Sequence, residues 1–140
     1  MQKIDQIIDD FNYFDNWEDK YEYLVDLGKN LENLDENLKN DQNKLKGCQS
    51  TVYFLAKENL DGTLKFLADS DAFIVRGLIS ILITIFSEKT PKEILDTDTK
   101  FLSKIGLQHH LSPTRKNGLS SMIDKIKHEA SLRVKSNDYK

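Results

Sequence analysis

The chain begins with apolar residues spaced at the period of an amphipathic helix. Those of residues 4–14 fall on one helical face: Ile4, Ile7, Ile8, Phe11 and Phe14. Asn16 can cap a second helix, because its side chain can accept from the free N–H groups of the first turn. The inward stripe of that helix is predicted as Trp17, Tyr21, Leu24, Leu27 and Leu31. The polar run 30–43 then predicts an irregular connector.

The middle of the chain changes to a strand pattern. Residues 51–58 are β-branched and aromatic in their first half, and residues 63–68 return as a partner strand. Asp61-Gly62 between them favours a hairpin turn. Residues 43–47 are a candidate for a short first strand. These segments predict a small antiparallel sheet with Cys48 at one end and the hairpin turn at the other.

A nearly all-apolar helix is predicted from about residue 72 to residue 87. Because it is apolar on almost every side, we expect it to be buried against the sheet. Asp69-Ser70-Asp71 precedes it and is interpreted as its N-terminal cap. Arg76 is predicted to mark its one solvent-facing side, and Gly77 a close approach of another segment.

Three further helices complete the prediction. Thr90-Pro91-Lys92-Glu93 is a capping-box start for a short helix to Leu95, and residues 97–105 predict another that Gly106 ends. Ser112 and Pro113 open the last helix, and residues from about 135 are expected to form a flexible tail. Its inner stripe is predicted as Leu119, Met122, Ile123, Ile126 and Ala130. The whole pattern predicts an α+β fold: a single domain over residues 1–140, with a small antiparallel β-sheet packed by helices.

Composition narrows the classes of function. The 20 basic and 23 acidic residues are interspersed and leave a net charge of −3, which argues against a nucleic-acid partner. The longest apolar run, residues 78–86, is far too short to span a bilayer, and the first residues lack the apolar core of a signal peptide. We therefore expect a cytoplasmic protein without a membrane partner. The usual nucleotide, zinc-protease and serine-hydrolase motifs do not occur.

The single cysteine, Cys48, is the main candidate for chemistry. One cysteine excludes an internal disulfide and multi-cysteine zinc or iron–sulfur sites. No metal or other cofactor is expected. A thiol is a strong nucleophile only as the thiolate, and Lys44 and Lys46 are nearby sources of the positive charge that favours this form. The alternative is structural, since a lone cysteine is most often a small buried hydrophobic residue.

Other candidates have simple structural explanations beside the functional ones. His109 and His110 could pair with Cys48, but adjacent histidines point in different directions on any regular element. Capping explains the Asp69–Asp71 run, with docking of a basic partner as the alternative. Arg115 lies in the first turn of the last helix, where a cation does not complement the helix dipole. A structural ion pair and a functional role, such as stabilising a thiolate, stay equally open for this arginine.

Four blocks, taken in order from about residue 5 to residue 130, resemble the SufE family. They are Gly47-Cys48-Gln49-Ser50 with Val52 and Tyr53; Asp69-Ser70-Asp71-Ala72 with Val75 and Gly77-Leu78; Thr90-Pro91 with Ile94-Leu95; and His110-Leu111-Ser112-Pro113-Thr114-Arg115 with Asn117-Gly118-Leu119 and Met122. SufE proteins are sulfur acceptors for cysteine desulfurases in iron–sulfur cluster assembly. The chain departs from the family pattern at Tyr53, Ala68 and Thr114, where tryptophan, glycine and serine are common.

The resemblance implies a SufE/IscU-like fold and a role for Cys48 as persulfide acceptor. The implied partners are a pyridoxal-phosphate-dependent SufS-type cysteine desulfurase, which the protein would stimulate, and a SufBCD-type scaffold that receives the sulfur. Partner-docking or supporting roles are expected for Gly47, Gln49, Ser50, Asp71 and Arg115. The chain would be a sulfurtransferase-type carrier rather than a stand-alone enzyme. Three alternatives stay open. The chain could be a non-carrier adaptor that activates a desulfurase, or a CsdE-like acceptor for another sulfur pathway, and it could form a weak homodimer.

Overall fold

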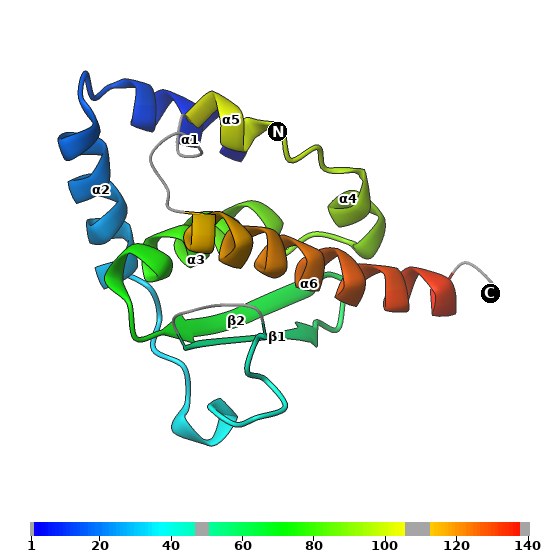
Figure 1. Ribbon diagram of the computed structural model, residues 1–140. Coiled ribbons are helices and arrows are strands. Elements are labelled where there is room, and N and C mark those ends of the chain that lie inside the picture. Colours follow the sequence, from blue (N-terminus) through cyan, green and yellow to red (C-terminus); the bar gives the residue numbers. More distant parts are fainter. Residues whose placement is uncertain (1, 47–50, 106–112, 138–140) are drawn as a thin grey trace.

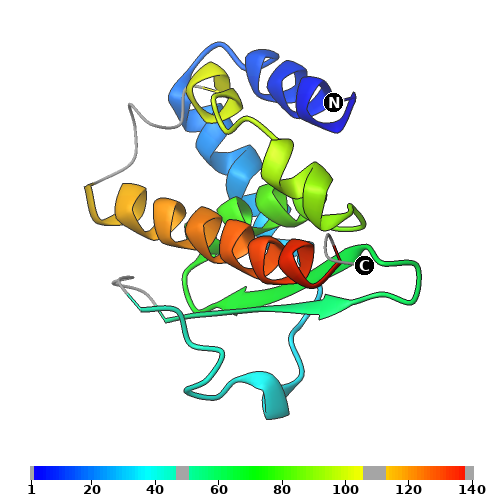
Figure 2. The same ribbon diagram turned by 90° about the vertical axis from the view of Figure 1, so that its right-hand side faces the viewer.

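The computed structural model describes residues 2–46, 51–105 and 113–137 (Figure 1). Its elements are α1 (Gln2–Asn12), α2 (Trp17–Lys29), the 3₁₀ helix η1 (Glu36–Leu38), β1 (Val52–Glu58), β2 (Leu64–Ser70), α3 (Phe73–Phe86), α4 (Pro91–Asp96), α5 (Phe101–Ile105) and α6 (Pro113–Asn137). The helices gather on one side of the two-stranded sheet, and the connector that contains η1 lies on the other side (Figures 1 and 2). The predicted α+β class is confirmed.

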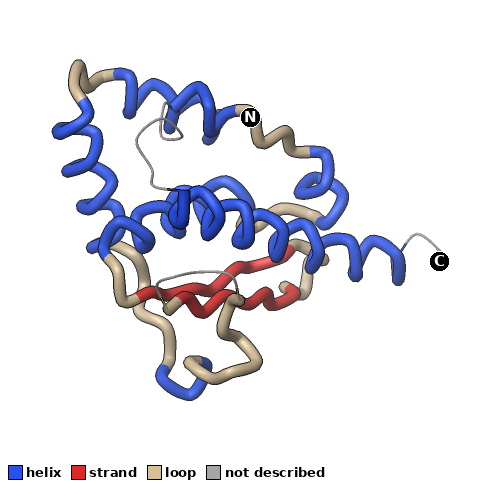
Figure 3. Tube along the Cα trace, viewed as in Figure 1, coloured by secondary structure: helices blue, strands red, loops and turns tan. Residues whose placement is uncertain are grey.

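The hairpin of β1 and β2 is antiparallel, with a register that runs from Val52 opposite Ser70 to Glu58 opposite Leu64. Figure 3 shows the two strands side by side, with the turn at one end only. At that turn Gly62 has a φ of 87°, a left-handed conformation that favours glycine. Asp61 Oδ1 accepts a hydrogen bond from Thr63 N at 3.0 Å. The turn predicted at Asp61-Gly62 is confirmed.

The outer edge of β1 is covered by the connector after α2. Leu45 N donates to Val52 O and Phe54 N donates to Asn43 O, each at 2.8 Å, and Lys44 forms a single bridge with Tyr53. The strand predicted at 43–47 is therefore wrong for its described residues. The physical reason is that the pairing with β1 is limited to one bridge at Lys44, because a turn closed by Asn43 N to Asn40 O at 3.1 Å precedes it and the chain turns again at residue 46.

The core lies between the hairpin and the helices, and α3 is its central helix, as predicted. Its buried residues are Ile74, Val75, Gly77, Leu78, Ile79, Ile81, Leu82, Ile85 and Phe86. At the crossing with α2, a Cβ added to Gly28 would lie 2.8 Å from Gly77 N, and one added to Gly77 would overlap the carbonyl oxygen of Leu24. The close approach predicted at Gly77 is confirmed.

Local capping signals are confirmed at two helix starts. Asn16 accepts from Asp19 N at 2.8 Å at the start of α2. Thr90 and Glu93 form a complete capping box at the start of α4, with Pro91 in its first turn. The inner stripe of α6 is also confirmed, because Leu119, Met122, Ile126 and Ala130 are buried and Ile123 packs against the core.

Other local predictions are corrected by packing. Tyr21 was expected to point inward but is 40% exposed, because the contact of α2 with α3 is centred on Leu24 and Gly28, one turn further along. Phe73, at the start of α3, is 63% exposed. The helix predicted from Thr97 begins only at Phe101, since Thr97 N and Oγ1 instead donate to carbonyls at the end of α4. Helix α6 extends to Asn137, into the segment expected to form a flexible tail. The flexibility of this tail stays a prediction.

Candidate functional site

The open end of the hairpin, opposite its turn, carries a pocket of about 260 Å³. Its described lining consists of Lys39, Thr51, Tyr53, Asp69, Ser70 and Asp71. The strand register brings these residues together, because Tyr53 of β1 lies opposite Asp69 of β2. We call this cavity the hairpin-end pocket.

The segment that holds Cys48 is attached to the hairpin-end pocket. Residues 47–50 join Lys46 to Thr51, and Thr51 lines the pocket. Cys48, Gly47, Gln49 and Ser50 themselves lie outside the described residues, as do His109, His110, Gly106 and Ser112.

The two other predicted site residues come from different elements. Asp71 follows β2, is exposed and lines the hairpin-end pocket. Arg115 lies in the first turn of α6, and its side chain is outside the described part of the chain. Both ribbon views show the start of α6 at the same end of the molecule as the end of β2 (Figures 1 and 2). The fold therefore brings Asp71 to the attachment point of residues 47–50 and brings the α6 backbone that carries Arg115 to the same end.

Asp69 forms a buried ion-pair centre at the base of the hairpin-end pocket. Its carboxylate accepts from Arg76 Nη1, and its Oδ2 lies 3.4 Å from Lys39 Nζ. The Asp69 side chain is 8% exposed and that of Arg76 is 14% exposed. Since a buried charge is strongly destabilising without a partner, each of these side chains depends on the other.

The predicted cap of α3 at Asp69-Ser70-Asp71 is wrong. Strand β2 continues through Ser70, and the N-cap of α3 is Ala72, which makes no side-chain capping hydrogen bond. The Ser70 hydroxyl accepts from Ala72 N at 3.3 Å, outside the helix. The physical reason is competition for the Asp69 carboxylate, which pairs with Arg76 instead of the helix end.

Arg76 was predicted to face solvent, and this prediction is also wrong. Its Nε donates to Gly28 O at 3.0 Å and its Nη2 donates to Leu31 O at 3.3 Å. Together with Asp69, these bonds tie α3 to the end of α2, to the connector and to the end of β2. The sequence did carry a signal for this burial, since Arg76 is the single charged residue in an otherwise apolar helix. An arginine in such a buried helix requires a partner, because arginine is almost never buried without one.

Lys39 is the cation that lines the hairpin-end pocket in the described residues, and carboxylates already engage it. Its Nζ lies 3.0 Å from Glu36 Oε1 and 3.4 Å from Asp69 Oδ2. The hydrogen bond to Glu36 first, and then Asp69, raise the pKa of Lys39 although desolvation opposes them. Further positive charge for a thiolate on residue 48 is available from Lys44, which is exposed and whose backbone bridges to pocket-lining Tyr53, and from exposed Lys46.

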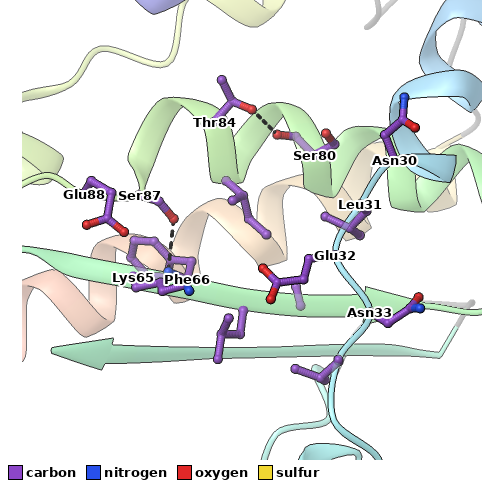
Figure 4. A pocket seen from close by; sticks show the side chains of 14 residues that line it. Asn30, Leu31, Glu32, Asn33, Lys65, Phe66, Ser80, Thr84, Ser87 and Glu88 are labelled. Atoms are coloured by element: carbon purple, nitrogen blue, oxygen red, sulfur yellow. Dashed lines mark hydrogen bonds between the residues drawn. The ribbon is translucent and has the colours of Figure 1, made fainter. Parts of the chain in front are cut away.

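A second cavity, of about 290 Å³, lies at the other edge of β2 (Figure 4). The connector 30–34, β2 residues 65–68 and the polar side of α3 line it. In Figure 4 the hydroxyl of Ser87 points to Phe66 N and that of Thr84 to Ser80 O, at 3.1 and 2.8 Å. These hydroxyl groups serve internal hydrogen bonds, so we take the hairpin-end pocket, joined to the cysteine segment, as the candidate site.

Neither a metal site nor a membrane-spanning helix is found in the described part of the chain. Residues 2–46, 51–105 and 113–137 hold no cluster of three or more histidine, cysteine or acidic side chains arranged to bind a metal ion. Over the same residues, no helix is both long and apolar enough to cross a membrane.

Comparison with known proteins settles the family. The SufE family model, described as an Fe-S metabolism associated domain, matches residues 5–130. The chain belongs to the SufE family. An uncharacterised SufE-like protein of Rhizobium meliloti (strain 1021) is 46% identical over 138 residues, which cover 96% of this chain and 99% of that protein. Another uncharacterised SufE-like protein, from Rhizobium etli, is 44% identical over 138 residues, covering 96% and 93%.

The fold of this SufE-family chain also matches a solved structure. The solution structure of a hypothetical protein from Thermus thermophilus superposes with a TM-score of 0.77 and covers 95% of this chain and 96% of that one. Its 16% identity makes this a likeness of fold alone. Membership of the SufE family gives the chain a role in sulfur transfer or iron–sulfur metabolism, together with a sulfur-donating partner.

Proposed function

We propose that this SufE-family protein is a sulfur carrier whose Cys48 accepts persulfide sulfur from a pyridoxal-phosphate-dependent cysteine desulfurase of the SufS type. One observation carries the proposal: the only cysteine of a SufE-family chain lies in the four-residue segment attached to the hairpin-end pocket. The protein stimulates the desulfurase and passes the sulfur to a SufBCD-type scaffold. It acts in the cytoplasm, where a free thiol stays reduced.

The reaction is a thiol exchange without net oxidation. The Cys48 thiolate attacks the outer sulfur of the persulfide on the desulfurase cysteine. The sulfur–sulfur bond in the desulfurase persulfide breaks, and the desulfurase cysteine leaves as a thiolate that takes up a proton. A new sulfur–sulfur bond forms on Cys48, which becomes the persulfide. One sulfur atom has then moved from the desulfurase to the carrier.

We expect the Cys48 thiol to react slowly before docking, because the charges that line the hairpin-end pocket oppose a thiolate and the exposed lysines Lys44 and Lys46 are not in that lining. Asp71 lines the pocket as an exposed carboxylate, and Lys39 is engaged by Glu36 and Asp69. A carboxylate near a thiol disfavours the thiolate. We therefore expect Cys48 of the free protein to alkylate with iodoacetamide more slowly than an exposed model thiol, and faster when the desulfurase is bound. Equal rates for the free protein and the model thiol would contradict this part of the proposal.

Docking is proposed to involve Asp71 and Arg115 together with Gly47, Gln49 and Ser50. Because Ala72 and not Asp71 is the N-cap of α3, Asp71→Ala should change the unfolding free energy by no more than about 0.5 kcal/mol. A large loss of desulfurase stimulation by this folded variant then reports docking. Arg115→Ala is read in the same way, and an unfolded Arg115→Ala protein would support a structural ion pair instead.

The deciding experiment measures the intact mass of the protein after incubation with a SufS-type desulfurase and free cysteine, without reductant. We expect a gain of one sulfur in the wild type and none in Cys48→Ser. If the desulfurase speeds up equally with both proteins and neither gains sulfur, the protein is an adaptor. If sulfur is added only with a Csd-type desulfurase in the same assay, the SufS-type partner is wrong and the carrier chemistry stands.

A further inference from the structure

The corner where α1 leads into α2 carries another pocket, of about 330 Å³. Its described lining is Asp9, Asp10, Tyr13, Phe14 and Tyr23, and we call this set the aromatic corner. Figure 1 shows the corner at the far end of α2 from the end of β2. A helix of 13 residues is about 20 Å long at 1.5 Å per residue, so the aromatic corner is separate from the hairpin-end pocket.

Three aromatic rings form a continuous wall of this pocket. The ring centroids of Tyr13 and Phe14 are 5.4 Å apart at an angle of 86°, and those of Phe14 and Tyr23 are 5.3 Å apart at 40°. Behind them the buried ring of Phe11 lies 5.1 Å from Tyr23, edge to face. Tyr13 nevertheless remains 81% exposed. The rings support one another and leave a large aromatic face open to a ligand.

The two carboxylates of the pocket have different surroundings. Asp10 accepts from the Tyr23 hydroxyl at 3.2 Å and from Gln6 Nε2 at 2.8 Å, which hold it in place. Burial first, and then the charge of Asp10, raise the pKa of Tyr23. Asp9 is exposed at the pocket, beside Tyr13.

The charge around the aromatic corner identifies the kind of occupant. Residues 9–22 contain six acidic residues against one lysine, a net charge of −5 in a chain whose total is only −3. An apolar side chain could cover the rings but would leave Asp9 and Asp10, the two acidic residues of the pocket lining, without a counter-charge. A cation satisfies both, because it is attracted to the face of an aromatic ring and to a carboxylate.

We propose that the aromatic corner binds an arginine side chain of a basic protein partner. A guanidinium group stacks on an aromatic face and forms a two-pronged pair with a carboxylate, which a lysine ammonium cannot do. Tyr13 supplies the open ring face and Asp9 the carboxylate. Asp10, held by Tyr23 and Gln6, adds negative charge at the base. This interaction is independent of Cys48 and of sulfur transfer.

The test uses the full-length protein labelled with ¹⁵N and kept reduced. It is titrated with a capped Gly-Arg-Gly peptide while the amide resonances are followed. We expect saturable shifts at residues 9–14 and at Tyr23, weaker binding at high salt, weaker binding of the matching lysine peptide, and no binding of the matching norleucine peptide. The same titration of Cys48→Ser should be unchanged, which separates this test from that of the carrier function.

Variants locate the binding. Tyr13→Ala removes a largely exposed ring and should weaken the arginine peptide about two- to fivefold, with a further loss on adding Asp9→Asn. Tyr21→Ala is the matched control, because Tyr21 is an exposed tyrosine that is not in the lining of the aromatic corner, and it should bind like the wild type. Equal affinity of the norleucine peptide, wild-type affinity of Tyr13→Ala, or no shift with any peptide would overturn the proposal. Shifts spread over acidic residues elsewhere, such as Glu36, would overturn it as well.

Discussion

Asp69→Asn tests whether one ion pair holds the hairpin end to the helices. The substitution keeps the size of the side chain and removes its charge. In the wild type the Asp69 carboxylate pairs with Arg76 and Lys39 and also accepts from Ser70 N at 2.8 Å. Because Asp69 and Arg76 are both largely buried, solvent can do little to replace the lost charge.

The expected loss of stability depends on the hydrogen bonds that Arg76 retains in the variant. Removing one partner of a buried ion pair costs about 3–5 kcal/mol. The new amide retains one oxygen acceptor, and Arg76 retains its bonds to the carbonyls of Gly28 and Leu31. We therefore expect a loss of about 2–3 kcal/mol in the free energy of unfolding. With a urea m-value of about 1–3 kcal/mol/M, the unfolding midpoint should fall by roughly 0.7–3 M.

The assay is urea unfolding at pH 7, followed by far-ultraviolet circular dichroism. Asp71→Asn makes the same chemical change two residues away on an exposed side chain and should stay within about 0.5 kcal/mol of the wild type. The double variant Asp69→Leu/Arg76→Met removes both charges and should lose less than Asp69→Asn, because no buried charge is left unpaired.

Two results would refute this reasoning. If Asp69→Asn unfolds at the same urea concentration as Asp71→Asn, the buried ion pair does not stabilise the fold. If the double variant is less stable than Asp69→Asn, the arginine stabilises the protein through its packing and backbone hydrogen bonds, and its charge does not need the carboxylate.

Three further predictions concern the helices. Gly77→Ala should lower stability by about 1–3 kcal/mol in thermal unfolding, since the added methyl group overlaps the carbonyl of Leu24; an unchanged midpoint would contradict the close α2–α3 crossing. Hydrogen bonds from the backbone and then the side chain of Thr90 lower the pKa of Glu93, so its stabilising effect is present above the unfolded value of 4.5 and is lost as the pH falls through the lower folded value. The stability difference between wild type and Glu93→Gln should accordingly shrink below pH 4.5, and a pH-independent difference would exclude this linkage. Lys127→Met should cost about 1–3 kcal/mol, because the Lys127 ammonium donates to three carbonyls at the end of α4, the shortest at 2.6 Å; a stability equal to the wild type in urea would show that water replaces these bonds.

Much of the fold was predictable because its signals are local. The cap at Asn16, the capping box at Thr90 and the Asp61-Gly62 turn each depend on residues no more than three positions apart, and all three are confirmed. Helix α3 was recognisable because a nearly all-apolar helix has one stable place, the core. The single cysteine and the four ordered blocks were likewise readable from the residues, and the family they indicated is confirmed.

The tertiary structure decided the features whose partners are distant along the chain. Arg76 binds carbonyls 45 and 48 positions away, so its local sequence can signal that the arginine needs a buried partner but not which groups supply it. Because the buried Arg76 needs a counter-charge, Asp69 is its ion-pair partner and not the helix cap that the local sequence predicts. The aromatic corner also depends on packing, because Phe14 and Tyr23, nine positions apart, meet only when the chain turns between α1 and α2. Local sequence determines which elements form, whereas burial of charge and packing between elements determine what their side chains do.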